Sequence, residues 1–169
     1  IHYAKLENVI ADTFEKGEIP FILILDRITD VRNFGAIART AECAGVHAIV
    51  LPSRGAAQIN ADAMKTSSGA LNFIPVCKED SLIQTIDFLQ NSGLRVVACT
   101  EKAKSTIYEI DYKDPIAIIM GSEEDGITDE IIRKSDEIAK IPQAGQVGSL
   151  NVSVAAGVII FETVRQRSI

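Results

Sequence analysis

The sequence predicts an α/β fold in which a parallel sheet is covered by helices on both faces. Short apolar runs alternate along the chain with segments of helical periodicity, as in a series of βαβ units. The apolar runs are nearly continuous and do not alternate with polar residues, which is typical of parallel strands buried on both sides. A chain of 169 residues is long enough to form one domain with a sizeable core.

The individual elements follow from these patterns. Residues 3–16 place apolar side chains at helical spacing and stop at Gly17, which predicts a short amphipathic helix leading into the main fold. The apolar runs predict strands at 21–26, 48–51, 73–76, 94–99, 116–120 and 137–141. The segments between and after them predict helices at 34–44, 60–68, 81–91, 128–135 and 152–166.

Composition excludes several classes of protein. No apolar run is long enough to span a membrane, and no basic-then-apolar leader opens the chain. The cysteines are odd in number, far apart and free of any CxxC pair, so we expect no structural zinc site and a reduced, cytoplasmic setting. We expect Cys43 and Cys99 to be buried, because both sit among apolar neighbours.

The charge distribution is uneven. The net charge of −6 argues against a protein that coats nucleic acid nonspecifically, and all of it falls in residues 101–137. The remaining chain is neutral and leaves room for a local basic surface, although a scatter of solvated charges is the alternative. Such a surface would be built from Arg27, Arg32, Arg39, Arg54 and Lys65.

The first of three polar segments follows the expected strand 21–26 and opens a helix. Asn33 is a suitable N-cap, and Gly35 lets another group approach the backbone. Arg39 lies one turn beyond Gly35 on the same helical face, where a guanidinium above a missing side chain would suit a phosphate. The alternative is an ordinary surface arginine paired with a nearby carboxylate.

The second segment is an acidic loop between Gly121 and Gly126, directly after an apolar strand. Ligands of open α/β sheets bind beyond the carboxyl ends of strands. Its adjacent carboxylates would bind a cation or position a hydroxyl or an arginine. Consecutive residues rarely converge on one ion, so we expect no metal here. A solvated acidic turn is the alternative.

The third segment, residues 141–153, is a turn-rich loop that runs directly into an apolar helix. Ser149 or Asn151 is suited to cap that helix, and free N–H groups at its start favour a polar ligand. The alternative is an ordinary strand-to-helix turn. The chain has neither the Gly-x-Gly-x-x-Gly nor the Gly-x-x-x-x-Gly-Lys-Thr pattern, so the usual dinucleotide and nucleoside-triphosphate loops are absent.

In this order and at this spacing, the three segments resemble the motifs of the SpoU (TrmH-like) family of RNA ribose 2′-O-methyltransferases, within the SPOUT superfamily. The resemblance covers roughly residues 20–166. The matching stretches are Asn33-x-Gly35-Ala-Ile-Ala-Arg39-Thr-Ala, Met120-Gly-Ser-Glu-x-x-Gly126, and Ile141-Pro142 through Ser149-Leu-Asn151-Val-Ser153-Val-Ala.

The resemblance implies a C-terminal trefoil knot, although chains are in general unknotted. It also implies S-adenosylmethionine (AdoMet) held within that knot in a bent form. By position, the cofactor-binding residues would be Thr100, Gly121, Ile141 and Leu150. On this view the small residues at 145, 148 and 155–157 leave room for threaded backbone.

The catalytic residues implied by the family pattern are Arg39, Asn33, Glu124, Ser149 and Asn151. A ribose 2′-hydroxyl would attack the sulfonium methyl in line. Arg39 is usually given the activation of that hydroxyl, but a guanidinium stays protonated, so we expect it to hold phosphate and stabilise the developing alkoxide. Asn33 would orient the ribose or Arg39, and Glu124 would orient Arg39 or the nucleotide. Arg32, Arg39 and Arg54 would contact RNA.

Further stretches, including Ala44–Val50 and Phe161–Arg167, are similar to the branch that methylates a guanosine of large-subunit ribosomal RNA. Members usually carry an extra N-terminal RNA-binding domain and work as homodimers. We therefore expect residues 1–20 to be a linker and N-terminal helix left from that domain, and 21–169 to be the catalytic domain. The alternatives are a transfer RNA 2′-O-methyltransferase, or a non-catalytic RNA or ribosome-assembly module of the same fold.

Overall fold

The computed structural model describes residues 2–169 and confirms the parallel α/β architecture. Its sheet has six strands in the order β3-β2-β1-β5-β4-β6, and every pairing is parallel. The strands are β1 (Phe21–Asp26), β2 (Ala48–Pro52), β3 (Val76–Glu79), β4 (Arg95–Cys99), β5 (Ile116–Gly121) and β6 (Glu137–Ala139). β1 and β5 are buried along almost their full lengths, which agrees with their unbroken apolar sequences.

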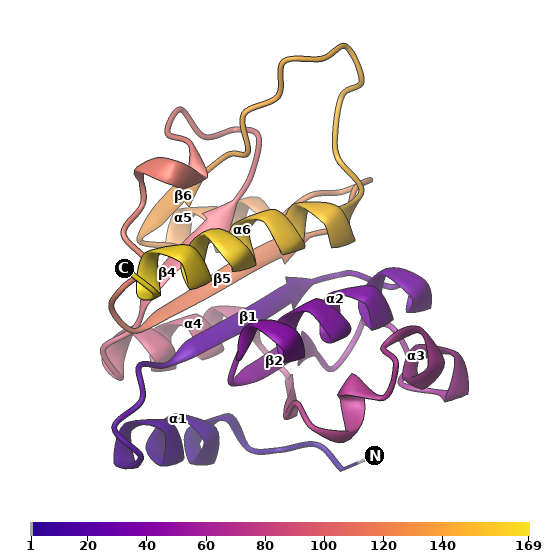
Figure 1. Ribbon diagram of the computed structural model, residues 1–169, viewed down its shortest axis with the longest axis vertical. Coiled ribbons are helices and arrows are strands. Elements are labelled where there is room, and N and C mark those ends of the chain that lie inside the picture. The colour runs from indigo at the N-terminus through magenta and orange to yellow at the C-terminus, as the bar shows by residue number, and fades with distance from the viewer. Residues whose placement is uncertain (1) are drawn as a thin grey trace.

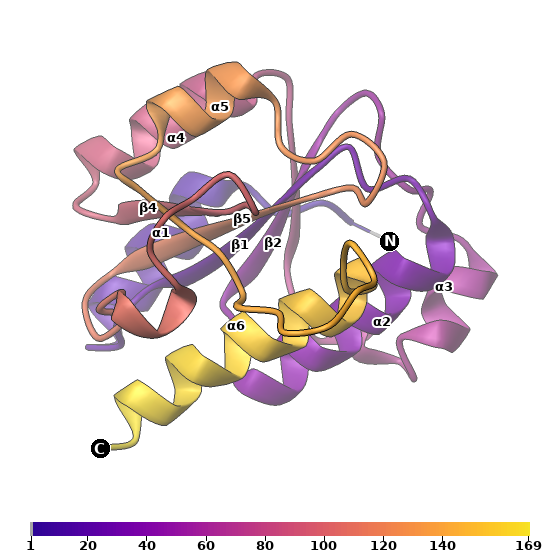
Figure 2. The same ribbon diagram turned by 90° about the horizontal axis from the view of Figure 1, so that it is seen from above.

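Helices cover both faces of the sheet (Figures 1 and 2). One face is packed against α2 (Val31–Ala44), α3 (Ala61–Thr66) and α6 (Val152–Arg167). The other face is packed against α1 (Leu6–Glu15), α4 (Leu82–Asn91) and α5 (Asp129–Lys134). Each layer has its own apolar cluster, so the sheet lies between two cores. No helix in residues 2–169 combines the length and the apolar character that crossing a bilayer requires.

Several predicted boundaries are displaced, among them the start of the first helix, which begins at Leu6, and the end of the last strand, which ends at Ala139. Two other displacements have identifiable reasons. The third strand begins at Val76, not at 73, because Phe73 and Ile74 donate their N–H groups back to the carbonyl of Ala70 in a 3₁₀ turn. The helix expected at 34 begins at Val31, because Asp30 caps it: its Oδ1 accepts from Asn33 N at 2.9 Å. Asn33 is therefore not the N-cap.

Arg167 fastens the end of α6 to the edge of the sheet opposite the carboxyl ends of the strands. Its guanidinium donates to four backbone carbonyls within 3.1 Å and lies over the ring of Phe21. Those carbonyls belong to Ile19, Pro20, Tyr112 and Asp114. Because these residues precede β1 and β5, one side chain ties the last helix to the two central strands.

We expect Arg167→Met to lower the free energy of unfolding by about 2–4 kcal/mol, because several carbonyls lose a charged donor at once. Urea denaturation of the wild type and the variant measures this change. Arg133→Met is the matched control, since Arg133 is exposed and makes no hydrogen bond or ion pair within residues 2–169. The control should change stability by less than about 0.5 kcal/mol. Equal effects would show that Arg167 is no more than a surface charge.

Candidate active site

The centre of the sheet contains a topological switch point. From β1 the chain proceeds outward to β2 and β3, then crosses to the other half of the sheet, so β1 and β5 are neighbours whose following loops diverge. Asp26, the last residue of β1, is in register with Gly121, the last residue of β5. Such crevices beyond the carboxyl ends of strands are the usual ligand sites of open α/β sheets. Two cavities open here.

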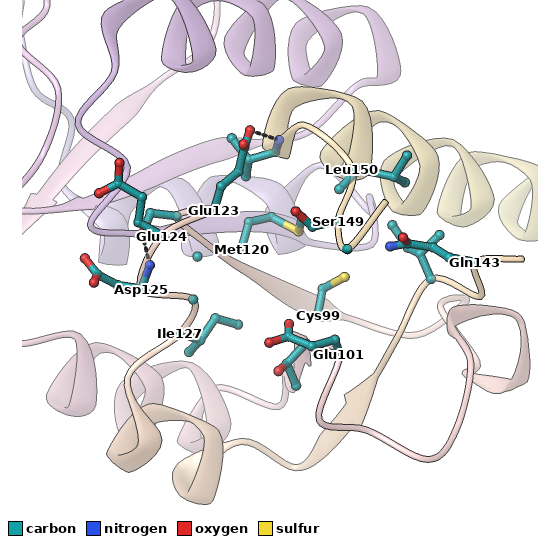
Figure 3. Close-up of a pocket in the computed structure, with 18 residues that line it drawn as sticks. Cys99, Glu101, Met120, Glu123, Glu124, Asp125, Ile127, Gln143, Ser149 and Leu150 are labelled. Carbon is teal, nitrogen blue, oxygen red and sulfur yellow. Dashed lines mark hydrogen bonds between the residues drawn. The ribbon is translucent and has the colours of Figure 1, made fainter. Parts of the chain in front are cut away.

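The first cavity, of about 280 Å³, brings together the second and third polar segments and the end of β4 (Figure 3). All four residues predicted to bind cofactor line it: Thr100, Gly121, Ile141 and Leu150. Ser149 and Glu124, predicted to be catalytic, also line it. Three stretches that are separate along the chain thus converge on one space, although the first polar segment is not among them.

The walls of this cavity combine apolar surface with negative charge. Met120, Ile127 and Leu150 supply apolar surface, and Glu101 and Glu123 supply carboxylates. Ligand sites generally combine apolar walls with a few fixed polar groups. The charges favour a ligand that carries a positive charge beside an apolar or aromatic part.

Glu123 lines both cavities and anchors the acidic loop, and sequence reasoning passed it over in favour of its neighbour. Its Oε1 accepts a hydrogen bond from Val152 N, at the start of α6, at 2.9 Å. A carboxylate at a helix N-terminus satisfies a free N–H group and interacts favourably with the helix dipole. Glu123 therefore joins the acidic loop to the third segment, whereas Glu124 makes no side-chain hydrogen bond within residues 2–169. The sequence motif could have indicated Glu123, because it is the acidic residue inside the matched stretch Gly-Ser-Glu.

Asn151 and Asn33 connect the third segment to the first. Asn151 is the N-cap of α6, with Oδ1 accepting from the N–H groups of Ser153 and Val154. Its Nδ2 donates to Asn33 Oδ1 at 3.1 Å. The two asparagines thereby hold the starts of α2 and α6 together. Asn33 also lines the second cavity.

Arg39 occupies a different position from these residues. It is exposed on α2, makes no hydrogen bond or ion pair within residues 2–169, and lines neither cavity. The expected gap above Gly35 is absent, because a Cβ there would lie 2.7 Å from Thr66 Cβ of α3. Gly35 thus permits close packing of α2 on α3. The alternative, an Arg39 paired with a nearby carboxylate, is not found within residues 2–169 either.

The other predicted RNA contacts are surface residues. Arg32 is exposed in the first turn of α2, and Arg54 is exposed in the loop after β2. The small residues of the third segment do not make room for nearby backbone, since a Cβ on Gly145 or Gly148 would meet nothing within 4 Å. The trefoil knot stays a prediction.

The acidic loop is also fastened to β1. The buried carboxylate of Asp26 accepts from both N and Oγ1 of Thr128 at 2.8 Å. Next to it, Arg27 adopts a positive φ of 57° and donates from Nη2 to the carbonyl of Gly126 at 3.3 Å. These contacts hold the wall between the two cavities. Neither residue appears in the predicted site.

The cysteines differ in exposure. Cys43 is exposed on α2, so its expected burial is wrong, whereas Cys99 is largely covered and lines the first cavity. Burial raises the pKa of the Cys99 thiol, and also that of Cys77, to about 12. Both thiols therefore stay protonated at neutral pH. Only the thiolate is the reactive form of cysteine.

We expect one thiol, that of Cys43, to react within minutes with a disulfide reagent at pH 7.5, and the other two only after unfolding. A pKa near 12 leaves roughly one thiol in 10⁴–10⁵ ionised at that pH. Mass spectrometry after proteolysis identifies the modified residue. Cys43→Ser should abolish the fast phase, and a fast phase that survives would contradict the assignment.

No cluster of three or more His, Cys, Asp or Glu suited to a metal is found in residues 2–169.

Comparison with known proteins identifies the family to which this chain belongs. The SpoU rRNA Methylase family matches residues 20–161. The chain belongs to that family. It is 42% identical over 162 residues to the 23S rRNA (guanosine-2′-O-)-methyltransferase RlmB of Photorhabdus laumondii, and 41% identical to that of Escherichia coli K12. These matches cover 96% of this chain, and the chain spans 66% and 67% of the two relatives' lengths.

Solved structures of RNA-modifying enzymes share the fold. An AdoMet-bound rRNA methyltransferase from Sinorhizobium meliloti superposes with a TM-score of 0.81 at 32% identity, covering 86% of this chain and 56% of that one. The TrmH/SpoU tRNA modifying enzyme of A. aeolicus gives 0.80 at 30% identity, covering 96% and 84%. The predicted family and the α/β fold class are thus confirmed.

Proposed function

We propose that this chain is the catalytic part of an AdoMet-dependent enzyme that methylates a ribose 2′-hydroxyl, most specifically that of a guanosine in 23S ribosomal RNA. The observation that carries the proposal is the convergence of Thr100, Gly121, Ile141 and Leu150 on one cavity. The identity to guanosine-2′-O-methyltransferases along nearly the whole chain supports the substrate. A cytoplasmic location accords with such a substrate.

The residues present fit AdoMet. The ligand has an apolar and aromatic adenosine part, and it carries positive charge on its sulfonium and amino groups. The apolar walls of the first cavity suit the former, and the carboxylates of Glu101 and Glu123 suit the latter. When bound, AdoMet would supply an electrophilic methyl group. Thr100, Gly121, Ile141 and Leu150 would hold it.

The protein has to align a ribose with that methyl group and help its hydroxyl lose a proton. Alignment of reactants can account for about 7–11 kcal/mol of a barrier. In our proposal Ser149 and Asn151 form the polar rim, Asn33 orients the ribose, and Glu124 orients the nucleotide. Arg39 holds an RNA phosphate and stabilises the developing alkoxide, because its guanidinium remains protonated and cannot act as a base. Arg32 and Arg54 contact RNA further out.

A homodimer would explain the position of Arg39. Arg39 lies on α2, which packs beside α6, yet it lines neither cavity of its own chain. α6 is apolar on most sides, and its Val154 and Phe161 are about half exposed, whereas such helices are generally buried. We propose that a second copy covers this face and that each Arg39 serves the partner's cavity.

In the same proposal, residues 1–20 form the segment that leads to an RNA-binding domain.

The test is in two steps. Calorimetry of this chain should detect AdoMet binding, and a lack of binding at about 1 mM, an affinity limit near −4 kcal/mol, would favour a non-catalytic module. The full-length protein should then transfer methyl groups to 23S ribosomal RNA transcripts, with the product mapped as a 2′-O-methylguanosine. If the protein methylated only transfer RNA, its substrate would instead resemble that of the tRNA modifying enzyme of A. aeolicus.

A further inference from the structure

The second cavity, of about 470 Å³, lies directly beside the first. The two share Ser122–Asp125 and Val152 as a common wall. On the far side, the second cavity is bounded by residues 27–30 after β1, by Asn33 of α2 and by Gly55. It lies at the switch point of the sheet, and its volume is in the usual range for a small-molecule site. A nucleotide whose ribose faces the first cavity would place its base or its phosphate here.

Arg27 presents a fixed guanidinium to this cavity. The backbone turns at this residue with a positive φ, which is uncommon for any residue other than glycine. The side chain is held by the carbonyl of Gly126, and its Nε lies 3.5 Å from Asp26 Oδ1. Nε is nevertheless buried and makes no hydrogen bond within residues 2–169. Nε is too deeply buried to reach a ligand, but Nη1 makes no hydrogen bond within residues 2–169, so the outer end of the positioned fork keeps N–H groups for a ligand.

The charge of the remaining wall distinguishes a base from a phosphate. Asp30, Glu124 and Asp125 line the cavity, and Asp30 uses only Oδ1 to cap α2. The side chains of Glu124 and Asp125 accept no hydrogen bond within residues 2–169, and in Figure 3 both point away from Gln143 and Leu150. Several carboxylates around one arginine would repel a phosphate. They are, however, good acceptors for the N–H groups of a base.

We propose that the second cavity is the subsite for the base of the methylated nucleotide, and that it selects guanine. Guanine offers the adjacent donors N1–H and N2–H₂ to a carboxylate, and the acceptors O6 and N7 to an arginine fork. Glu124 accepts from the donor edge and Arg27 donates to the acceptors. An unpaired RNA base exposes both edges at once. The inference rests on the proposed function, in which a guanosine ribose is the methyl acceptor.

Binding of mononucleotides tests the subsite without any methyl transfer. GMP and IMP differ only in the 2-amino group, so the pair isolates the contact with Glu124. With S-adenosylhomocysteine present, NMR titration of this chain should show GMP binding at least about fivefold tighter than IMP or AMP. Shifts should centre on the amides of residues 27–30 and 122–126. Glu124→Gln should remove the preference for GMP over IMP.

Two further variants separate base reading from simple charge. Arg27→Lys keeps the positive charge but loses the fork, and should weaken GMP binding about tenfold. Glu130→Gln removes an exposed carboxylate outside both cavities and should leave the preference intact. Equal affinity for GMP, IMP and AMP would overturn the proposal, as would competition by inorganic phosphate. So would no GMP-dependent shift at about 10 mM, where a ligand with a Kd of 1 mM is saturated.

The outcomes remain distinct from those of the proposed function. AdoMet binding and methyl transfer with no preference among mononucleotides would reject the subsite and keep the enzyme. A preference for GMP that Glu124→Gln removes, in a protein that transfers no methyl group, would keep the subsite and reject the enzyme.

Discussion

Arg39→Ala should lower kcat/KM for methyl transfer by about 10²–10³-fold or more, while AdoMet binds with unchanged affinity. The expected loss is that of removing one group that stabilises a developing oxyanion. Arg39 is exposed and bonds to no other group in residues 2–169, so the variant should keep its melting temperature. Single-turnover assays and calorimetry measure the two effects. Loss of cofactor binding together with activity would point instead to misfolding.

Mixed dimers test whether Arg39 acts across the interface. One chain carries Arg39→Ala, and the other carries Leu150→Asp, which damages the cofactor cavity. If each Arg39 serves the partner's cavity, the mixed dimer has one complete site and should recover up to half of the wild-type activity. If Arg39 serves its own cavity, both sites are defective and no activity returns. Both substitutions in the same chain, paired with a wild-type chain, give the opposite expectation.

The architecture was predictable because burial determines it locally. The strands β1 and β5 are apolar at nearly every position, and parallel strands covered on both faces require this. The C-terminal end of α2 was predictable for the same reason, because a single residue determines it. Gly45 takes a left-handed conformation with a φ of 80°, as expected at a helix C-terminus. The convergence of the second and third polar segments on one cavity, with the first segment beside it, followed from strand direction, since all carboxyl ends meet at the same edge.

The errors arose where two neighbouring residues offer the same chemistry. Asp30 and Asn33 are both good N-caps, and only the tertiary contact of Asn33 with Asn151 shows which one is free for another role. Glu123 and Glu124 are likewise equivalent in sequence. Both line the shared wall of the two cavities, but the turn of the loop brings only the first to the N–H group of Val152 in α6. No local pattern contains that information.

Long-range packing explains the remaining differences. The space above Gly35 is filled by α3, which sequence reasoning placed correctly as a helix but not against that residue. In the sequence, Arg27 was only one member of a possible local basic surface. Its role depends on the carbonyl of Gly126, about 100 residues further along the chain. Such contacts are determined by the topology of the sheet.

Gly121→Ala should weaken AdoMet binding by at least about 100-fold and lower the melting temperature by about 5–15 °C. A Cβ at this position would lie 2.4–2.5 Å from the backbone of Gly126 and Ile127, closer than real atoms approach. The clash is with main chain, which is held by the bond from Gly126 N to Ser122 O, so no side-chain rotation relieves it. The acidic loop must move, and the shared wall of both cavities moves with it.

A matched control is available in the same cavity. Gly148 also lines it, but a Cβ there would meet nothing within 4 Å, and its φ is not positive. Gly148→Ala should therefore leave both the melting temperature and the AdoMet affinity nearly unchanged. Thermal unfolding of the apo protein measures the first, and calorimetric titration with AdoMet measures the second. If Gly121→Ala behaves like this control, the acidic loop is free to relax. The Arg27, Asp26 and Glu123 contacts would then not hold the wall on which both proposed subsites depend.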